Sequence, residues 1–157
     1  MGGTGITGNY PFEDMRLNND NIVEFVSLVI GSQEDAKVRT LRTDRILSGY
    51  GHMMNLGLAR AYGTADDKGN PTGFLLGMHS VEPLNGERMA FEYLFMVSPG
   101  SGDTARKLLA EFEAGAREDG CVKIVVGCHK EFKPKVLERW YRRLGFSWVT
   151  SSFERTL

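Results

Sequence analysis

The segment from residue 91 to residue 118 constrains the fold most, because it joins a strand pattern directly to a helix pattern through small residues. Phe91-Glu-Tyr-Leu-Phe-Met-Val97 is apolar and rich in residues that favour strands. Ser98-Pro-Gly-Ser-Gly-Asp-Thr104 follows, and a helical pattern covers residues 105–118. A glycine-containing turn that opens a helix directs backbone N–H groups at whatever lies beyond it. The segment therefore predicts a phosphate-binding edge on a sheet.

A second strand follows this helix. Gly120 ends the helix, and residues 122–126 are short and nearly continuously apolar, which is typical of a strand in the interior of a sheet. Two strands that are joined by a helix pair in parallel through a right-handed crossover. Residues 91–126 therefore predict a parallel β-α-β unit.

The last elements read as one further helix and one further strand. Pro134 opens a helix that runs to about residue 144, and Gly145 ends it. We expect Phe146–Phe153 to form a final strand.

Two helices and three strands are predicted upstream. Short turn-forming clusters separate the three strands, and such connections favour an antiparallel meander. The helices cover residues 21–30 and 45–54, and the strands cover residues 56–64, 72–81 and 88–97. The element order α-α-β-β-β-α-β-α-β predicts an α+β fold around one mixed sheet, with helices on both faces.

The N-terminal residues differ in composition from the rest. Met1–Phe12 is rich in glycine, threonine and asparagine and shows little periodicity, which predicts a flexible arm. We therefore expect an N-terminal arm over residues 1–14 and one domain over residues 15–157. The arm is a candidate contact for a protein partner.

Composition narrows the function classes. A chain of 157 residues suits a single domain with a hydrophobic core. The formal net charge of −1 gives no general attraction to nucleic acid, so a nucleic-acid partner is not expected. No apolar run approaches the roughly 20 residues that a membrane-spanning helix needs. The N-terminus lacks a signal-peptide pattern, and a cytoplasmic location is expected.

The cysteines and histidines give no metal-binding pattern. Cys121 and Cys128 flank the strand at 122–126, which separates them by roughly 23 Å and argues against a mutual disulfide. Neither cysteine belongs to a Cys-x-x-Cys pair, and no histidine has a second ligand at metal-binding spacing. His79 and His129 lie near predicted strand ends, where a histidine acts as a base or simply packs.

Two segments together carry a family resemblance. The first is Val97-Ser-Pro, its small-residue loop and Lys107-Leu-Leu109. The second combines Gly120, the strand after it, and Tyr141-Arg-Arg-Leu-Gly-Phe146. In this order they resemble the acyl-CoA-binding segment and the C-terminal block of the GCN5-related N-acetyltransferase (GNAT) superfamily.

The likeness covers roughly residues 56–153 and looks closest to small acetyltransferase-like proteins of bacteriophages. It implies a meander that leads into a parallel strand pair, and these two strands splay apart at the phosphate loop. It also implies acetyl-CoA as cofactor and transfer of its acetyl group to an amine, of a small molecule or a protein, that the sequence does not identify.

The phosphate loop departs from the family pattern, which usually reads Gln/Arg-x-x-Gly-x-Gly/Ala. The three key places fall on Gly100, Asp103 and Ala105, and of these Ala105 alone fits. Asp103 brings a carboxylate toward the expected pyrophosphate, or else acts as a helix N-cap. The loop is therefore degenerate.

The resemblance implies two sets of cofactor-binding residues. Backbone groups of Met96, Val97 and Ser98 would hold the pantetheine arm. Backbone N–H groups of Ser101, Gly102, Asp103, Thr104 and Ala105 would hold the pyrophosphate.

The resemblance also implies two catalytic residues. Tyr141 matches the general acid that returns a proton to the leaving thiolate. Glu92 lies on the strand that meets the cofactor, where a carboxylate can deprotonate an incoming ammonium. Each has a structural alternative: Tyr141 packing beside Trp140, and Glu92 facing solvent from an alternating strand.

Two other functions stay open. The degenerate loop and the arm suggest a catalytically inactive interaction or structural protein of a bacteriophage, either a virion component or an inhibitor of a host protein, in the host cytoplasm or in the virion. Arg139, Arg142 and Arg143 share one helix face, and this basic face is either simply solvated or contacts the cofactor's 3′-phosphate or nucleic acid.

Overall fold

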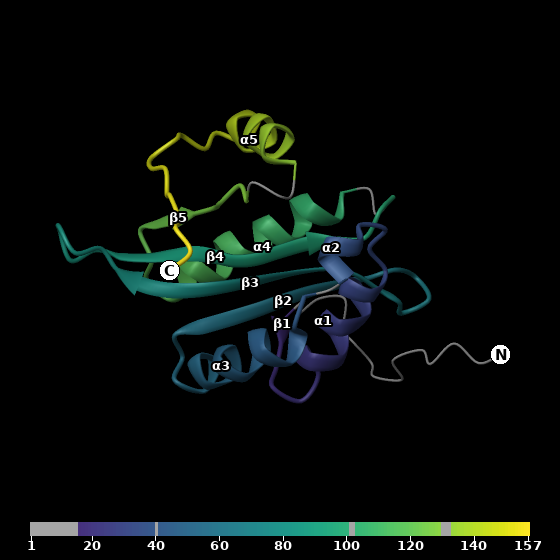
Figure 1. Cartoon of the computed structure of the whole chain (residues 1–157). Coiled ribbons are helices and arrows are strands. Elements are labelled where there is room, and N and C mark those ends of the chain that lie inside the picture. The colour runs from purple at the N-terminus through teal and green to yellow at the C-terminus, as the bar shows by residue number, and fades with distance from the viewer. Residues whose placement is uncertain (1–15, 40, 101–102, 130–132) are drawn as a thin grey trace. The chain divides into compact units, whose positions relative to one another are not determined.

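The computed structural model describes residues 16–39, 41–100, 103–129 and 133–157 (Figure 1). The described residues group into two compact units, one ending at Val125 and one beginning at Val126. The predicted arm over residues 1–14 lies outside the described residues. The two units are considered separately below.

The first unit is built on a five-stranded mixed sheet in the order β1-β2-β3-β4-β5. β1 to β4 pair antiparallel, and β5 pairs parallel with β4. The predicted meander and the parallel crossover are both confirmed. The strands are β1 (Arg16–Leu17), β2 (Ala59–Ala65), β3 (Pro71–Val81), β4 (Arg88–Val97) and β5 (Lys123–Val125).

Side chains in the turns set the register of the meander. Between β2 and β3, Asp66 Oδ1 accepts hydrogen bonds from the backbone N–H groups of Lys68 and Asn70, both at 2.9 Å. Between β3 and β4, Asn85 Oδ1 accepts one from the backbone N–H of Glu87 at 2.9 Å. Aspartate and asparagine favour turns for this reason.

Helices cover both faces of this sheet, as predicted (Figure 1). A Cβ atom added to Gly63 would lie 2.5 Å from the Phe25 ring of α1. One added to Gly77, on the other face, would lie 2.5 Å from the Phe112 ring of α4. Glycine thus lets both layers approach the sheet closely. The helices of this unit are α1 (Ile22–Gly31), α2 (Ala36–Arg39), α3 (Thr43–Asn55) and α4 (Thr104–Glu118).

The second unit contains the helix α5 (Pro134–Arg143), which matches the predicted helix. Gly145 has φ +90, and the backbone N–H of Phe146 bonds the carbonyl of Tyr141 at 3.1 Å. This left-handed glycine ends the helix as predicted.

The predicted strand at Phe146–Phe153 is wrong, because none of these residues forms a strand. β5 is therefore the edge of the sheet rather than an interior strand, and Val122 beside it is 64% exposed. Local residue preferences can favour an extended chain, but a strand forms only where it pairs with the edge of another strand. β5, the edge strand of this sheet, is itself short, with three residue pairs to β4.

Two short elements were not predicted. β1 has two residues and α2 has four. Elements this short carry no readable periodicity. Cys121 is half-buried and Cys128 is exposed. Among the described residues, no helix combines the length and apolarity required to cross a membrane.

We expect two Gly→Ala substitutions in helices to have opposite effects on stability. In α4, a Cβ at Gly115 would lie 2.0 Å from the hydroxyl oxygen of Tyr62, which is buried. In α3, a Cβ at Gly49 would meet nothing within 4 Å. Gly115→Ala should lower the free energy of unfolding by about 2 kcal/mol through overpacking.

Gly49→Ala is the matched control, and it should raise the free energy of unfolding by about 0.5–1 kcal/mol because alanine favours the helix. Urea unfolding followed by circular dichroism measures both variants. Equal effects at the two positions would show that Tyr62 does not press against α4.

Candidate functional site

β4 has partners of unequal length on its two sides. On one side it pairs with β3 along its length, from Arg88 to Val97. On the other side the parallel ladder with β5 ends where Phe91 meets Val125. The residues from Glu92 to Val97 therefore run beyond this ladder. Residues 92–97 are called the separated part of β4 below, because the ladder with β5, which ends at Val125, does not include them. That the two strands splay apart stays a prediction.

A β-bulge lies at the start of this separated part. Leu76 faces Leu94 and Gly77 faces Glu92, which leaves Tyr93 as the extra residue of β4. Opposed residues of an antiparallel pair point to the same face. Glu92 therefore shares the face of Gly77, on which α4 packs, whereas Leu94 shares the opposite face with Leu76.

Two tyrosines support the bulge. The ring of Tyr93 stacks on that of Tyr50 in α3, with centroids 5.7 Å apart and planes 16° apart. The Tyr50 hydroxyl lies 2.6 Å from the carbonyl oxygen of Gly77 and 2.5 Å from that of Arg60. Burial raises the pKa of Tyr50, so the hydroxyl keeps its proton as a donor.

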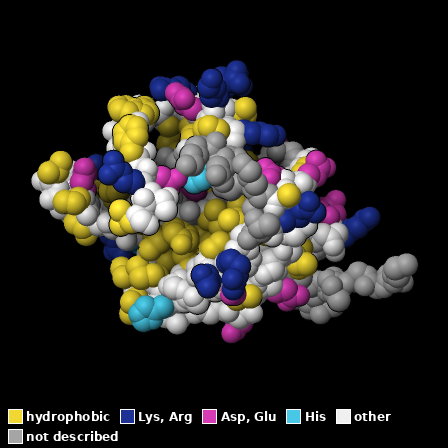
Figure 2. Space-filling model, viewed as in Figure 1, with side chains coloured by type: hydrophobic (Ala, Val, Ile, Leu, Met, Phe, Trp, Pro, Cys, Tyr) yellow, Lys and Arg dark blue, Asp and Glu magenta, His cyan; other side chains and the backbone are white. Residues whose placement is uncertain are grey.

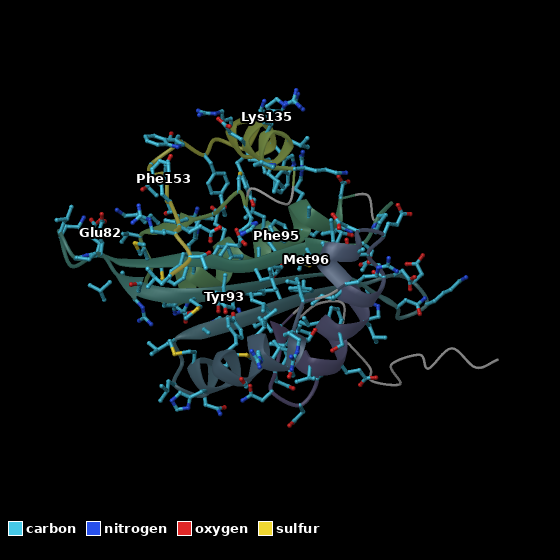
Figure 3. All side chains as sticks on the ribbon, in the orientation of Figure 1. Glu82, Tyr93, Phe95, Met96, Lys135 and Phe153 are labelled. Carbon is cyan, nitrogen blue, oxygen red and sulfur yellow. The ribbon has the colours of Figure 1, made fainter. Side chains whose placement is uncertain are left out.

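Tyr93 itself is 48% exposed. Tyr93, Phe95 and Met96 follow one another along β4, and Glu82 lies in the turn at the other end of the strand (Figure 3). Figure 2 shows hydrophobic side chains gathered over β2, β3 and β4 on the displayed face. The bulge thus presents an aromatic ring beside the separated part of β4.

The C-terminal end of α1 is tied to the end of β4. The backbone N–H of Ser98 bonds the carbonyl of Thr72 in β3 at 2.7 Å, so the polar groups of Val97 point away from β3. The carbonyl of Val97 accepts a hydrogen bond from Gln33 Nε2 at 3.1 Å. The hydroxyls of Ser32 and Ser98 lie 2.8 Å apart.

The start of α4 lies close to the same place. A Cβ at Gly73 in β3 would lie 2.9 Å from Cγ2 of Thr104 and 3.0 Å from the carbonyl oxygen of Met96. Glycine at this position lets the first turn of α4 approach β3 and β4. Asp103 occupies the N-cap position, but its side chain makes no capping hydrogen bond, and it is exposed.

The structure therefore brings most of the expected cofactor-binding residues of the first unit to one end of the sheet. Met96 is buried, Val97 ends β4 and Ser98 follows it, and Thr104 and Ala105 open α4. Ser101 and Gly102 lie outside the described residues. Glu92 lies earlier on β4 and is half-buried.

Tyr141 lies in the second unit, on α5. It is buried, and its ring contacts those of Trp140 (centroids 5.2 Å apart) and Phe146 (5.6 Å). The basic face of the same helix contains one internal ion pair, from Arg142 Nη2 to Glu138 Oε1 at 2.9 Å.

Sequence reasoning missed the polar residues that bind the end of β4. Gln33 and Ser32 follow the glycine that ends α1, and in sequence they read as an ordinary helix stop. Tyr50 and Tyr93 carried no signal either, because a bulge is not visible in a hydrophobic pattern. Long-range hydrogen bonds of this kind appear when the fold is assembled.

A cluster of Arg60, His79 and Asp119 lies at the opposite end of the sheet. His79 is near the end of β3, as expected, and its buried Nε2 lies 3.1 Å from Asp119 Oδ2. Asp119, at the C-cap of α4, also accepts from Arg60 Nη2 at 2.6 Å. His79 pairs with Ala90 in the ladder, and six residues separate Ala90 from Met96, which is about 20 Å along a strand. His79 therefore does not belong to the site at the end of β4.

Other histidines lie apart from the candidate residues in the chain. His52 is exposed on α3, and His129 is exposed after β5. Within the described ranges, no group of three or more His, Cys, Asp or Glu side chains is arranged to hold a metal ion.

Solved structures share this architecture. A ribosomal-protein-alanine N-acetyltransferase from Brucella melitensis biovar Abortus 2308 matches with TM-score 0.68 and 19% identity, over 90% of this chain and 97% of that one. AAC(6')-Iy, solved with the bisubstrate analogue CoA-S-monomethyl-acetylneamine, matches with TM-score 0.68 and 15% identity, over 90% and 95%. The chain has the GNAT acetyltransferase fold.

An aminoglycoside acetyltransferase from an uncultured soil metagenomic sample also has the GNAT fold, with TM-score 0.70 and 14% identity over 90% of this chain and 95% of that one. No protein-family model matches the chain, and no curated protein matches it. At these identities the likeness concerns the fold.

We expect His79 to make stability depend on pH. Burial lowers the pKa of His79, and Arg88 and Arg60 lower it further, although Asp119 opposes them. An unfolded histidine titrates near pH 6.5. Below about pH 6.5 the unfolded chain therefore binds a proton that the folded chain resists, and the free energy of unfolding falls.

Urea unfolding at pH 7.0 and at pH 5.0 measures this loss, which for one proton is at most about 1.4 kcal/mol per pH unit. His79→Gln should reduce the loss, whereas the exposed His52→Gln control should leave it unchanged. An identical loss in His79→Gln and the wild type would exclude His79 as its source.

Proposed function

We propose that this chain is an acyl-CoA-dependent N-acetyltransferase that transfers an acetyl group to an amine. The observation that carries the proposal is the end of the β4–β5 ladder at Phe91, with β4 leading directly into the start of α4. The GNAT fold supports it, and one protein with this fold was solved with a CoA-containing analogue.

In the proposed complex, the pantetheine arm pairs with the edge of β4. An extended ligand can add to a strand edge through backbone hydrogen bonds. The residues for this role are Met96, Val97 and Ser98. The support is that the polar groups of Val97 point away from β3, since Ser98 donates toward Thr72.

The pyrophosphate takes the N-terminus of α4. A helix N-terminus has unpaired N–H groups and a partial positive charge, which attract phosphate. α4 has 15 residues, and its N-cap residue Asp103 makes no side-chain capping bond. Asp103, Thr104 and Ala105 would supply N–H groups, together with Ser101 and Gly102, which lie outside the described residues.

Two side chains move protons in this proposal. The acetyl carbon forms a bond to the amine nitrogen while its bond to sulfur breaks. Glu92 accepts the proton from the amine, and Tyr141 donates its proton to the departing sulfur. Positioning of the two substrates supplies most of the rate. Small-molecule amines are the first acceptors to test, because two structures with this fold are aminoglycoside acetyltransferases.

A second candidate function is a GNAT-fold interaction protein without catalysis, including a bacteriophage component. One observation favours it: Asp103 places a carboxylate at the start of α4, where an anion would bind. Under this candidate function, residues 1–12 would bind the protein partner, and the protein would act in the cytoplasm or in the virion. Acetyl-CoA binding separates the two candidates.

We expect 1 mM acetyl-CoA to raise the melting temperature. A ligand at 100 times its dissociation constant stabilises the folded state by about 2.7 kcal/mol, which for a chain of this size is roughly 5–10 °C. Differential scanning fluorimetry measures the shift, with 1 mM ATP as the nucleotide control. No shift with acetyl-CoA would overturn the enzymatic proposal and favour the interaction protein.

Asp103→Asn should bind acetyl-CoA about fivefold more tightly. Two like charges about 4 Å apart repel by roughly 1 kcal/mol in water, and the amide removes this repulsion while keeping an N-cap oxygen. Isothermal titration calorimetry measures the dissociation constant. Asp67→Asn, in the turn between β2 and β3, is the matched charge control. Equal affinities in both variants would place the pyrophosphate away from Asp103.

Tyr141→Phe should lower kcat at least tenfold while changing the dissociation constant of acetyl-CoA less than twofold, because it removes the proton donor and keeps the ring. Release of free thiol with a panel of primary amines measures kcat. A variant with unchanged turnover would clear Tyr141 of the acid role and leave it as a packing residue.

A further inference from the structure

The carboxamide of Gln33 holds the last outward-facing carbonyl of β4. Residues 97 and 98 alternate in direction along the strand, so the Val97 carbonyl points away from β3. Gln33 Nε2 donates to this oxygen at 3.1 Å. The end of α1 therefore reaches the same strand edge that the proposed pantetheine arm uses.

The position of Gln33 is fixed by its neighbours. Its Nε2 group donates a second hydrogen bond to the carbonyl of Val29 at 3.2 Å, so both amide protons are used. Ser32 donates to the same carbonyl at 2.7 Å, and because a hydroxyl has one proton, Ser98 donates to Ser32. Val29 and Ile30 are buried, which anchors this end of α1.

A ligand along this edge competes for the same space. A chain that pairs with a strand lies about 4.8 Å from it. An amide nitrogen of such a chain would lie about 2.9 Å from the Val97 oxygen, and the Gln33 nitrogen already lies 3.1 Å from that oxygen. Its primary amide also has the same donor chemistry as the secondary amides of an extended ligand. The side chain thus occupies the edge as an internal substitute for a ligand amide.

We propose that the Gln33 side chain occupies the edge of β4 where the pantetheine arm would pair, and that acetyl-CoA displaces its carboxamide from the Val97 carbonyl. We call this hydrogen bond between Gln33 and Val97 the latch. This inference rests on the proposed function. Closing the latch ties α1 to β4 when the site is empty. Binding releases the side chain at the start of the link between α1 and α2, and the hydrogen bond given up reduces the observed affinity.

Gln33→Ala tests the latch by calorimetric titration with acetyl-CoA. Removing a competing hydrogen bond should tighten binding about 3- to 10-fold. Ser27→Ala is the matched control, because it removes a side-chain hydrogen bond of α1, to the carbonyl of Val23, that does not involve β4, and its affinity should stay within twofold of wild type. Gln33→Asn should behave like Gln33→Ala, because its shorter side chain no longer reaches the Val97 carbonyl. It keeps the test valid if the alanine variant disrupts the end of α1.

The outcomes separate this inference from the proposed function. Tighter binding by both Gln33 variants, with Ser27→Ala unchanged, supports the latch, and this includes the case where wild type binds too weakly to measure. If wild type binds acetyl-CoA and the Gln33 variants bind it equally well or more weakly, the latch alone is overturned. No binding by any of the four proteins overturns the proposed function, and the latch with it.

A spectroscopic readout distinguishes displacement from simple packing. In a ¹H–¹⁵N spectrum, the side-chain NH₂ signals of Gln33 should shift on addition of acetyl-CoA, because they lose their backbone acceptor. The same signals should be absent in Gln33→Ala, which assigns them. NH₂ signals that stay fixed while acetyl-CoA binds would show that the carboxamide keeps its place.

Discussion

The unequal pairing of β4 is the constraint on which the candidate site depends. β3 holds β4 over its length, whereas β5 follows it for three residue pairs. β3 therefore holds the strand and its bulge, whereas the ladder on the other edge ends at Phe91. Hydrogen bonds to β3 position the backbone, and beyond Phe91 the ladder with β5 no longer uses the backbone groups of the other edge.

The bulge at Tyr93 sets which side chains accompany this edge. Without the extra residue, Glu92 and Leu94 would point to the same face; with it they point to opposite faces. Tyr50 stabilises the arrangement from α3 through ring stacking and its buried hydroxyl. A position next to the site thus depends on a helix distant in sequence. The two ends of the sheet also differ, since ionic contacts around Asp119 close one end and uncharged groups of α1 tie the other.

Most of the first unit could be predicted because its signals are local. Strand patterns, turn residues and helix stops predicted the meander, the crossover and three of the unit's four helices within a few residues. The strand predicted at Phe146–Phe153 was wrong because a strand requires a partner, and the residues of one segment do not show whether a partner edge is present. β1 and α2 are too short to carry a period.

The candidate site could be predicted in outline, as the end of a strand that leads into a helix. Its details could not, because they depend on contacts between distant residues. The Gln33 carboxamide meets Val97 across 64 positions of the chain, and Ser32 meets Ser98 across 66. Neither pair leaves a mark in composition or periodicity. Asp103 shows the converse, since the sequence indicated it as a helix N-cap and the structure has it at that position, but the sequence could not tell that its side chain makes no capping hydrogen bond.

The placement of the aromatic residues has one further consequence. The chain has two tryptophans, Trp140 on α5 and Trp148 after it, and both belong to the unit that begins at Val126. The sheet unit contains tyrosine and phenylalanine but no tryptophan over residues 1–125. Emission excited near the red edge of the indole band therefore reports the surroundings of the C-terminal unit, whereas tyrosine absorbance is dominated by the sheet. A single optical experiment can follow the two units separately as they melt.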